Sequence, residues 1–255
     1  MAPRKNERLQ QVVEILRRNE QATVSELALT VRVTEMTIRR DLELLEKDGV
    51  LERFHGGARL IVSSSYEPLL SVRSKMHVEE KRALARTVAS VLRDGETVIL
   101  DGGSTGVTIA EELKSRRLTV CPLSLRVAWA FEQSTSVTLL MPPGAARAGE
   151  LSLSGPETID YLGRHHFDHY VMTASGFSIS SGFTEWNTDD AAVKRAALTG
   201  AKRTIAAVDT SKFGQDAFAS ICDLSAPASV AVSGPLTTEE EEQIRRASMT
   251  LLIAD

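Results

Sequence analysis

The chain has 255 residues, enough for two domains, and with 42% hydrophobic and 25% charged residues it has the composition of a globular protein. It contains no run of 18 apolar residues, so no membrane span is expected. Its first residues lack the apolar core of a secretory signal. Its two cysteines have no spacing typical of a disulfide framework or a metal site. We therefore expect a cytoplasmic protein that holds no metal and no cofactor.

The charge is distributed unevenly along the chain. Residues 1–60 contain 11 lysines and arginines against 10 acidic residues, whereas residues 61–255 contain 19 against 24. A net charge of −4 excludes a protein that binds nucleic acid through bulk charge. Any contact with DNA must come from a local cluster of basic residues.

The first part of the chain predicts three helices. Apolar residues recur at helical spacing over about residues 6–19. Thr23 and Glu26 have the spacing of a capping box, which starts a second, short helix. Thr34 is the expected N-cap of a third helix, which ends before Gly49.

The third helix has one apolar and one polar face. Ile38, Leu42 and Leu45 share the apolar face, which is expected to pack on the other two helices. The N-terminal part of such a helix reaches base edges in the major groove, while an arginine at its side is better placed for phosphate, which is the role expected of Arg39. The residues of this helix and its cap that are expected to contact DNA are Thr34, Met36, Thr37, Arg39 and Arg40.

Residues 50–60 predict a wing, with two short strands that turn at Gly56-Gly57. Arg53, His55 and Arg59 are expected to touch the DNA backbone or the minor groove. The alternative is a three-helix packing unit with a solvated charged face. The capped short helix, the tight turn, the polar face and the ribbon together favour DNA binding.

Four motifs in this stretch carry a resemblance. They are Glu26-Leu27-Ala28, Val33-Thr34, Thr37-Ile38-Arg39-Arg40-Asp41-Leu42 and His55-Gly56-Gly57-Ala58. Together they resemble the N-terminal winged helix-turn-helix of the DeoR family of bacterial transcription regulators. The resemblance implies that residues 1–60 form a DNA-binding domain whose partner is operator DNA.

Residues 61–76 are expected to link this domain to a second one over residues 77–255. The segment has no clear periodicity, and Ser63-Ser64-Ser65 and Pro68 favour a flexible joint with one extended part. Phosphorylation of the serines is the less favoured interpretation.

The second domain begins with a predicted helix over Glu79–Leu92 and a buried strand over Thr97–Leu100. The Gly-rich turn Asp101–Gly106 then leads into another helix. In a strand, turn and helix of this kind, free amides and the helix dipole hold an anion, and the hydroxyls of Ser104 and Thr105 would add donors. Taken alone, the pattern also fits an ordinary connection in a parallel sheet.

Strands and helices then alternate. Further strand-like runs are Leu118–Cys121, Val137–Met141, Tyr170–Thr173, Thr204–Val208 and Leu251–Ile253. Helical stretches are Leu125–Gln133, Asp189–Leu198 and Glu239–Ala247. The alternation predicts an α/β fold with a mostly parallel sheet covered on both faces, in which ligands gather at the carboxyl ends of the strands.

Polar residues that follow these strands are the candidate effector site. Lys194 and Lys212 would add positive charge, although a single surface lysine is more often simply solvated. In the DeoR family, which residues 23–60 resemble, two glycines usually stand where this chain has Pro143-Gly144, and Arg147 would compensate for this departure. The complete set of candidates is Asp101, Gly102, Gly103, Ser104, Thr105, Ser124, Arg147, Gly176, Lys194 and Lys212.

This half of the chain also resembles the DeoR family. The motifs are Asp101-Gly102-Gly103-Ser104-Thr105, Gly182-Phe183-Thr184, Val193-Lys194-Arg195, and Asp209 with Ser211-Lys212-Phe213-Gly214. They resemble the sensor domain of that family, whose Rossmann-like fold is shared with ribose-5-phosphate isomerase and CoA transferases. The resemblance implies a phosphorylated sugar or a related metabolite as effector.

Three functions compete. A sugar-phosphate isomerase fused to a DNA-binding domain would need a carboxylate base. Asp101, Glu185 and Asp209 are available, but none stands in the sequence with a second acidic residue as a catalytic pair. A DNA-binding module whose second half only dimerises is the other alternative. We predict a homodimeric or homotetrameric repressor of carbohydrate metabolism genes that has no catalytic residues and is released from its operator by effector.

Overall fold

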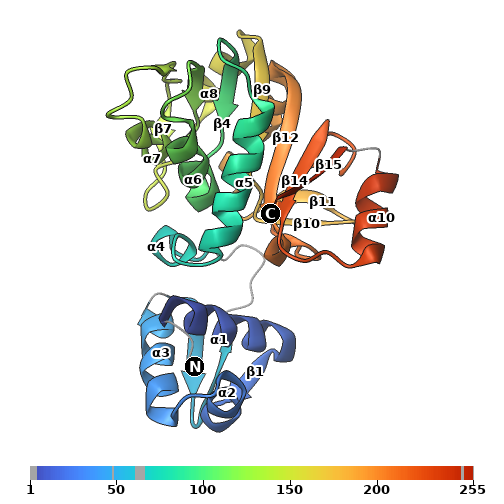
Figure 1. Cartoon of the computed structure of the whole chain (residues 1–255). Coiled ribbons are helices and arrows are strands. Elements are labelled where there is room, and N and C mark those ends of the chain that lie inside the picture. Colours follow the sequence, from blue (N-terminus) through green and yellow to red (C-terminus); the bar gives the residue numbers. More distant parts are fainter. Residues whose placement is uncertain (1–4, 48, 61–66, 248–249, 255) are drawn as a thin grey trace. The chain divides into compact units, whose positions relative to one another are not determined.

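The computed structural model describes residues 5–47, 49–60, 67–247 and 250–254, which divide into two compact units, Met1–His77 and Val78–Asp255 (Figure 1). The predicted α/β class is confirmed, because the larger unit has a parallel sheet with helices on both faces.

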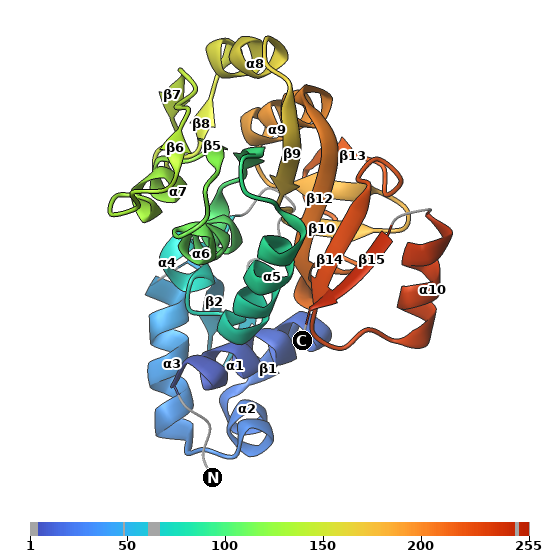
Figure 2. The same ribbon diagram turned by 45° about the horizontal axis from the view of Figure 1, so that its top comes forward.

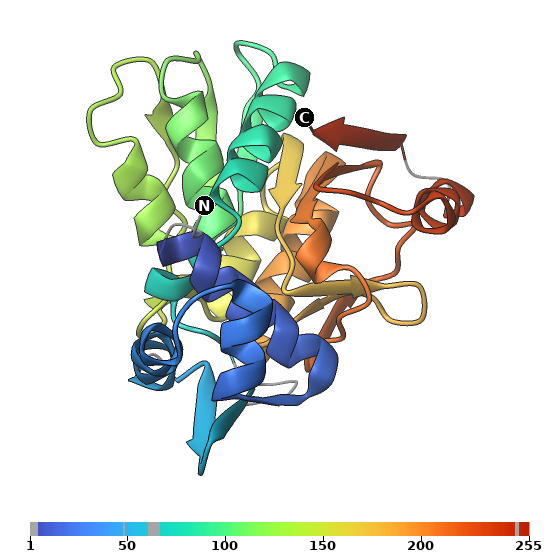
Figure 3. The ribbon, with the colours of Figure 1, turned by 60° about the horizontal axis from the view of Figure 1, so that its bottom comes forward.

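The first unit contains the predicted helices and wing. Its helices are α1 (Lys5–Asn19), α2 (Val24–Val31) and α3 (Glu35–Lys47), and its strands are β1 (Gln21–Thr23), β2 (Leu51–Phe54) and β3 (Gly57–Leu60). Figure 3 shows the wing strands in light blue next to these helices. The capping box of Thr23 and Glu26 is present, and Gly49 has a φ of 70°, as expected of a residue that follows a helix.

Strand β1 was not predicted. It pairs antiparallel with β3 and makes the wing a sheet of order β1-β3-β2. The pairing explains the second glycine of the His55-Gly56-Gly57 motif. A Cβ on Gly57 would lie 2.5 Å from the carbonyl oxygen of Ala22 in β1, so only glycine fits there.

The core of the first unit is apolar and includes one charged residue of α3. Ile38, Leu42 and Leu45 are buried, as their shared face predicted. Asp41 is also buried, and both of its oxygens accept from Arg8 of α1, at 2.5 Å from Nε and 3.0 Å from Nη2. This bidentate ion pair attaches the third helix to the first.

The predicted linker is partly folded. Residues 61–66 lie outside the described residues, so the serine run cannot be compared with the structure. Beyond them, α4 (Leu70–Arg73) is a short helix, and Val72 lies in the core of the first unit. This part of the segment therefore packs on the first unit, where a flexible joint with one extended part was expected.

The second unit is built on a seven-stranded sheet of order β15-β14-β12-β9-β4-β5-β6, parallel throughout (Figure 2). Its strands are β4 (Thr97–Leu100), β5 (Thr119–Pro122), β6 (Thr138–Leu139), β9 (Phe167–Met172), β12 (Ala201–Asp209), β14 (Ser229–Ser233) and β15 (Thr250–Ala254). The predicted strands are confirmed, whereas β14 was missed.

Helices cover both faces of this sheet. One face packs on α5 (Val78–Val91), α6 (Gly103–Leu113) and α7 (Leu125–Ala130). The other packs on α8 (Pro156–Gly163), α9 (Thr188–Gly200) and α10 (Thr238–Arg246). Neighbouring residues of β4 belong to different cores, since Val98 and Leu100 face the first group while Ile99 faces the second. Helix α8 was not predicted.

Short strands extend the carboxyl end of the sheet. β10 (Gly176–Ser178), β11 (Gly182–Glu185) and β13 (Ala219–Cys222) form an antiparallel sheet, and β7 (Ala145–Ala146) pairs with β8 (Leu153–Ser154). A 3-10 turn, η1 (Thr210–Lys212), follows β12. These short segments lack a usable hydrophobic period and were not predicted.

The strand order places a switch point between β4 and β9. The chain continues from β4 to β5 and β6 in one direction, and from β9 to β12, β14 and β15 in the other. Ligands of open α/β sheets bind outside the carboxyl ends of strands at such a point. Asp101 directly follows β4, and Thr173 directly follows β9.

Candidate functional site

The N-terminus of α3 is capped as predicted. The hydroxyl oxygen of Thr34 accepts from the amide of Thr37 at 3.3 Å, and the two hydroxyl oxygens lie 2.9 Å apart. The contact with Thr34 makes the Thr37 hydroxyl part of the helix start. Thr37 is half-buried and thus partly accessible. Met36 is 61% exposed beside it.

The other expected DNA-facing residues are exposed on α3 and the wing. Arg40 is exposed and forms no ion pair with any residue that the structure describes. Arg39, Arg53 and Arg59 each form an ion pair with a glutamate of the same surface. His55 is exposed in the turn of the wing.

Asp101 is buried at the end of β4 and is held by the backbone around it. One carboxylate oxygen accepts from the amide of Gly102 at 2.7 Å. The other accepts from the amide and the hydroxyl of Thr173 at 2.9 and 3.1 Å, and from the hydroxyl of Tyr170 at 3.3 Å. Asp101 is a candidate effector-site residue, and its contacts are those of a residue that braces the loop.

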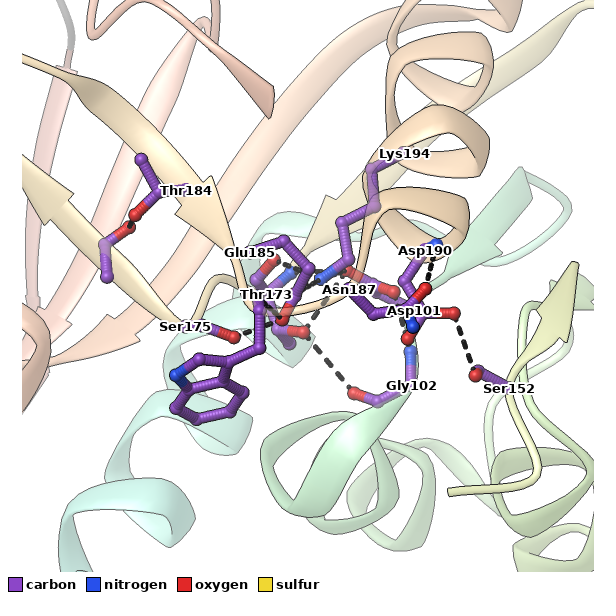
Figure 4. Close-up of polar contacts among 12 residues, drawn as sticks. Asp101, Gly102, Ser152, Thr173, Ser175, Thr184, Glu185, Asn187, Asp190 and Lys194 are labelled. Carbon is purple, nitrogen blue, oxygen red and sulfur yellow. Dashed lines mark hydrogen bonds and ion pairs between the residues drawn. The ribbon is translucent and has the colours of Figure 1, made fainter. Parts of the chain in front are cut away.

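Lys194 differs from its expected role. Its ammonium is buried and lies 3.0 Å from Asp101 Oδ2, 2.5 Å from Glu185 Oε2 and 2.9 Å from the carbonyl oxygen of Thr173 (Figure 4). An ammonium group has three N–H donors, and these contacts use all of them. Lys194 therefore joins β4 to β11 and has no donor left for a phosphate.

Charge compensation decides the protonation of this cluster. Burial alone would lower the pKa of Lys194, but Asp101 and Glu185 raise it above its usual range. Burial would likewise raise the pKa of Glu185, but Lys194 holds it below its usual range, helped by the hydroxyl of Ser175. Lys194 and Glu185 are therefore both charged at neutral pH.

The start of α6 keeps free donors. Gly102 is the N-cap and its amide already donates to Asp101, so it is not available to an anion as had been expected. The next amides, from Gly103 onward, lack acceptors within the helix. The hydroxyls of Ser104 and Thr105 have no hydrogen-bond partner among the described residues, although Ser104 is only 7% exposed.

Ser124 lies beside this loop. It is the N-cap of α7, accepting from the amide of Arg126 at 3.2 Å, and it is buried. A Cβ on Gly102 would lie 3.3 Å from the Cβ of Ser124, so the structure brings these two candidates together.

Arg147 and Gly176 have structural contacts. Arg147 donates to Asp190 Oδ2 at 2.6 Å, and Ser152 donates to Oδ1 of the same carboxylate at 2.8 Å, which ties the β7–β8 hairpin to α9. Burial raises the pKa of Asp190 although Arg147 opposes the shift. A Cβ on Gly176 would lie 2.2 Å from the carbonyl oxygen of Gln215, so glycine is needed for packing there.

Lys212 lies on η1 with its ammonium 5.1 Å from the ring centre of Trp186. Trp186 follows Glu185 and donates its amide to that carboxylate at 2.9 Å. This aromatic residue near the buried cluster was missed, as were Thr173 and Tyr170, because their partners are distant in the sequence.

No group of three or more potential metal-binding side chains is present in the described part of the chain. Among the same residues, no helix is both long and apolar enough to cross a membrane.

Comparison with known proteins covers nearly the whole chain. The model of the DeoR-like helix-turn-helix domain matches residues 8–64, and that of the DeoR C terminal sensor domain matches residues 76–233. The uncharacterized HTH-type transcriptional regulator YulB of Bacillus subtilis is 34% identical over 86% of this chain and 84% of its own length.

Two further proteins are similar at lower identity. The glycerol-3-phosphate regulon repressor of Escherichia coli is 27% identical over 88% of this chain and 89% of its own. Among solved structures, ribose 5-phosphate isomerase A from Methanocaldococcus jannaschii matches with a TM-score of 0.41 and 15% identity, over 54% of this chain and 55% of that one.

Proposed function

We propose that this chain, which belongs to the DeoR family of transcriptional regulators, represses genes of carbohydrate metabolism until a phosphorylated sugar-type effector releases it from operator DNA. It would act in the cytoplasm as a homodimer or homotetramer, because one small winged domain makes few base contacts.

The anion site at the start of α6 carries this proposal. The hydroxyls of Ser104 and Thr105 have no partner among the described residues, they stand at a helix N-terminus, and that terminus follows the strand at the switch point. Amides, hydroxyls and the positive end of a helix dipole are the usual donors to a phosphate group. The E. coli relative is named for glycerol-3-phosphate, which supports a phosphorylated effector.

The sugar part of the effector would extend toward Ser124 and Lys212. Asp101 and Lys194 would hold the loop in shape beneath it, since their hydrogen-bonding groups contact one another and the backbone. Binding would then change the DNA affinity of the first unit through residues 61–76, by no more than the difference in effector affinity between the two states.

An isomerase function is not favoured. A general base needs a pKa close to the working pH. The pKa of Glu185 lies below its usual range, and Asp101 accepts hydrogen bonds from Gly102, Thr173 and Tyr170. Glu185 is thus held in its ionised form and Asp101 binds protein groups, so we expect no turnover of ribose 5-phosphate.

The test uses an operator duplex selected by the wild-type protein from a random pool, and measures its release by fluorescence anisotropy. A panel of sugar phosphates and the matching free sugars is titrated. At least one phosphate should release the wild-type protein, and its free sugar should not.

The variant Ser104→Asp places a negative charge in the anion site and should abolish release while operator binding without effector is unchanged. Ser115→Asp, at an exposed position after the end of α6, is the matched control and should respond like the wild type. Release of Ser104→Asp at the wild-type effector concentration would contradict the proposed site.

A further inference from the structure

The DNA-facing segment has an unexpected charge. Residues 35–59 contain five lysines and arginines against six acidic residues. Asp41 is buried against Arg8 and does not face solvent. The remaining acidic residues still balance the basic ones, whereas a protein surface that contacts phosphates ordinarily carries excess positive charge.

Glutamates of this surface hold its arginines. On the recognition helix, Arg39 Nη2 lies 3.2 Å from Glu35 Oε2, one turn away. Glu35 Oε1 also accepts from the hydroxyl of Ser25 in α2 at 2.6 Å, so this carboxylate is oriented from two sides. The hydrogen bonds from Ser25 and Arg39 lower the pKa of Glu35, which keeps it charged.

Arg53 of the wing is held by two glutamates of α3. Its Nε lies 2.7 Å from Glu46 Oε2, and its Nη1 lies 3.4 Å from Glu43 Oε1. Arg53 is 37% exposed, so it is accessible to solvent but directed toward the helix.

The last pair lies within the wing, where Arg59 and Glu52 are directly opposite on β3 and β2 and form an ion pair. Arg40 differs from these arginines. It is exposed on α3 and forms no ion pair within the described residues.

We propose that these glutamates weaken the contacts between the paired arginines and DNA phosphates. The affinity for the operator then depends mainly on the base contacts around Arg40. The residues that screen the arginines are Glu35, Glu43, Glu46 and Glu52.

The physical argument concerns the difference between two complexes. Binding to arbitrary DNA comes almost entirely from phosphate contacts. An arginine that turns to a phosphate must leave its glutamate, and the carboxylate then lies near the DNA backbone. On the operator, base contacts fix the position of the protein, so an arginine cannot shift to a better phosphate. On arbitrary DNA the protein takes the position with the best phosphate contacts, so its affinity depends more strongly on whether these arginines are free. Screening therefore lowers the affinity for arbitrary DNA more than that for the operator, which is a gain in specificity.

The experiment compares two double variants that each remove two negative charges. Glu43→Gln/Glu46→Gln frees Arg53. The matched control Glu79→Gln/Glu111→Gln removes two exposed glutamates of the second unit, which pair with Arg82 and Lys114. Affinities of the full chain for the selected operator duplex and for a scrambled duplex of equal composition are measured over a range of salt concentrations.

The variant Glu43→Gln/Glu46→Gln should bind the scrambled duplex about threefold more tightly, and the slope of log affinity against log salt should steepen by about one. Its affinity for the operator should rise less, so the ratio of operator affinity to scrambled-duplex affinity falls. Adding Arg53→Ala should remove the gain. The control should match the wild type on both duplexes.

Three results would overturn the proposal: an unchanged affinity for the scrambled duplex, an equal gain on both duplexes, or an equal gain in the control. If the glutamates only hold the wing in place, operator affinity falls and the scrambled duplex is unaffected, which also overturns it. The thermal unfolding midpoint of each variant is measured as a control, and a midpoint equal to that of the wild type shows that the fold is intact.

Discussion

Within the motif Thr37-Ile38-Arg39-Arg40-Asp41-Leu42, neighbouring charged residues have different tasks. Asp41 is buried and accepts two hydrogen bonds from Arg8, so its task is to hold α3 against α1. Arg39 is held by Glu35, and Arg40 is exposed. Because successive residues of a helix point about 100° apart, adjacent positions of this motif face different surroundings.

Arg40→Ala tests the assignment of the base-reading residue. Operator affinity should fall by about 1–3 kcal/mol, with relaxed base choice at one position, because an arginine that contacts a base edge contributes to discrimination. Arg39→Ala is the comparison, and it should weaken binding to the operator and to all of its single-base variants alike. The measurement is competition binding against single-base variants of the operator. Wild-type affinity and base preference in Arg40→Ala would show that the recognition face is assigned wrongly.

At the scale of elements, α9 joins parts of the second unit that are remote in sequence. Asp190, in its first turn, holds the β7–β8 hairpin through Arg147, and Lys194, one turn later, joins β4 to β11. Three elements at the carboxyl end of the sheet thus depend on one helix. Helix α9 in turn is capped by Asn187, whose side chain accepts from the amides of Asp189 and Asp190.

Lys194→Met should destabilise the second unit by about 3–5 kcal/mol at neutral pH, because it leaves two buried carboxylates without their counter-charge. The folded pKa of Glu185 is below the ordinary 4.5, so its ion pair stabilises the wild type above about pH 4.5 and this stabilisation is lost as the pH falls. Without Lys194, burial favours the protonated form of Glu185, so protonation of this carboxyl relieves the variant at low pH.

The loss in free energy of unfolding caused by Lys194→Met should therefore shrink as the pH is lowered from 7 toward 4. Denaturant unfolding of the variant and the wild type at each pH measures this difference. Lys202→Met is the control, since that lysine is 69% exposed and pairs with Asp168. A deficit of Lys194→Met that stays constant with pH would contradict the charge argument.

At the scale of the molecule, the chain divides into a unit that would read DNA and a unit that would sense the effector. Each has its own apolar core, and α4 contributes Val72 to the first. Independent cores imply that each unit folds when separated from the other.

The fragment of residues 78–255 should therefore fold alone and self-associate. Circular dichroism is expected to show a cooperative unfolding transition, and sedimentation velocity a dimer or tetramer at micromolar concentration. A fragment of residues 1–77 should remain monomeric and bind operator DNA more weakly than the full chain. An unfolded or strictly monomeric 78–255 fragment would refute the assignment of self-association to the second unit.

Local patterns in the sequence were enough to predict α1, α2, α3, the wing and most strands of the parallel sheet. Helix caps, apolar periodicity and Gly-containing turns act over a few residues, so they can be read from the chain itself. Elements too short to show a period, such as β1 and β10, were not predictable.

Only the tertiary structure decided which charges are free. Lys194 looked like a phosphate ligand in the sequence, but the folded sheet brings Asp101, from a strand far earlier in the chain, within 3.0 Å of its ammonium. Arg53 likewise looked available for DNA until α3 and β2 placed Glu46 against it. The energy of a charged group depends on its burial and on its neighbours in space, and strand order and helix packing set both.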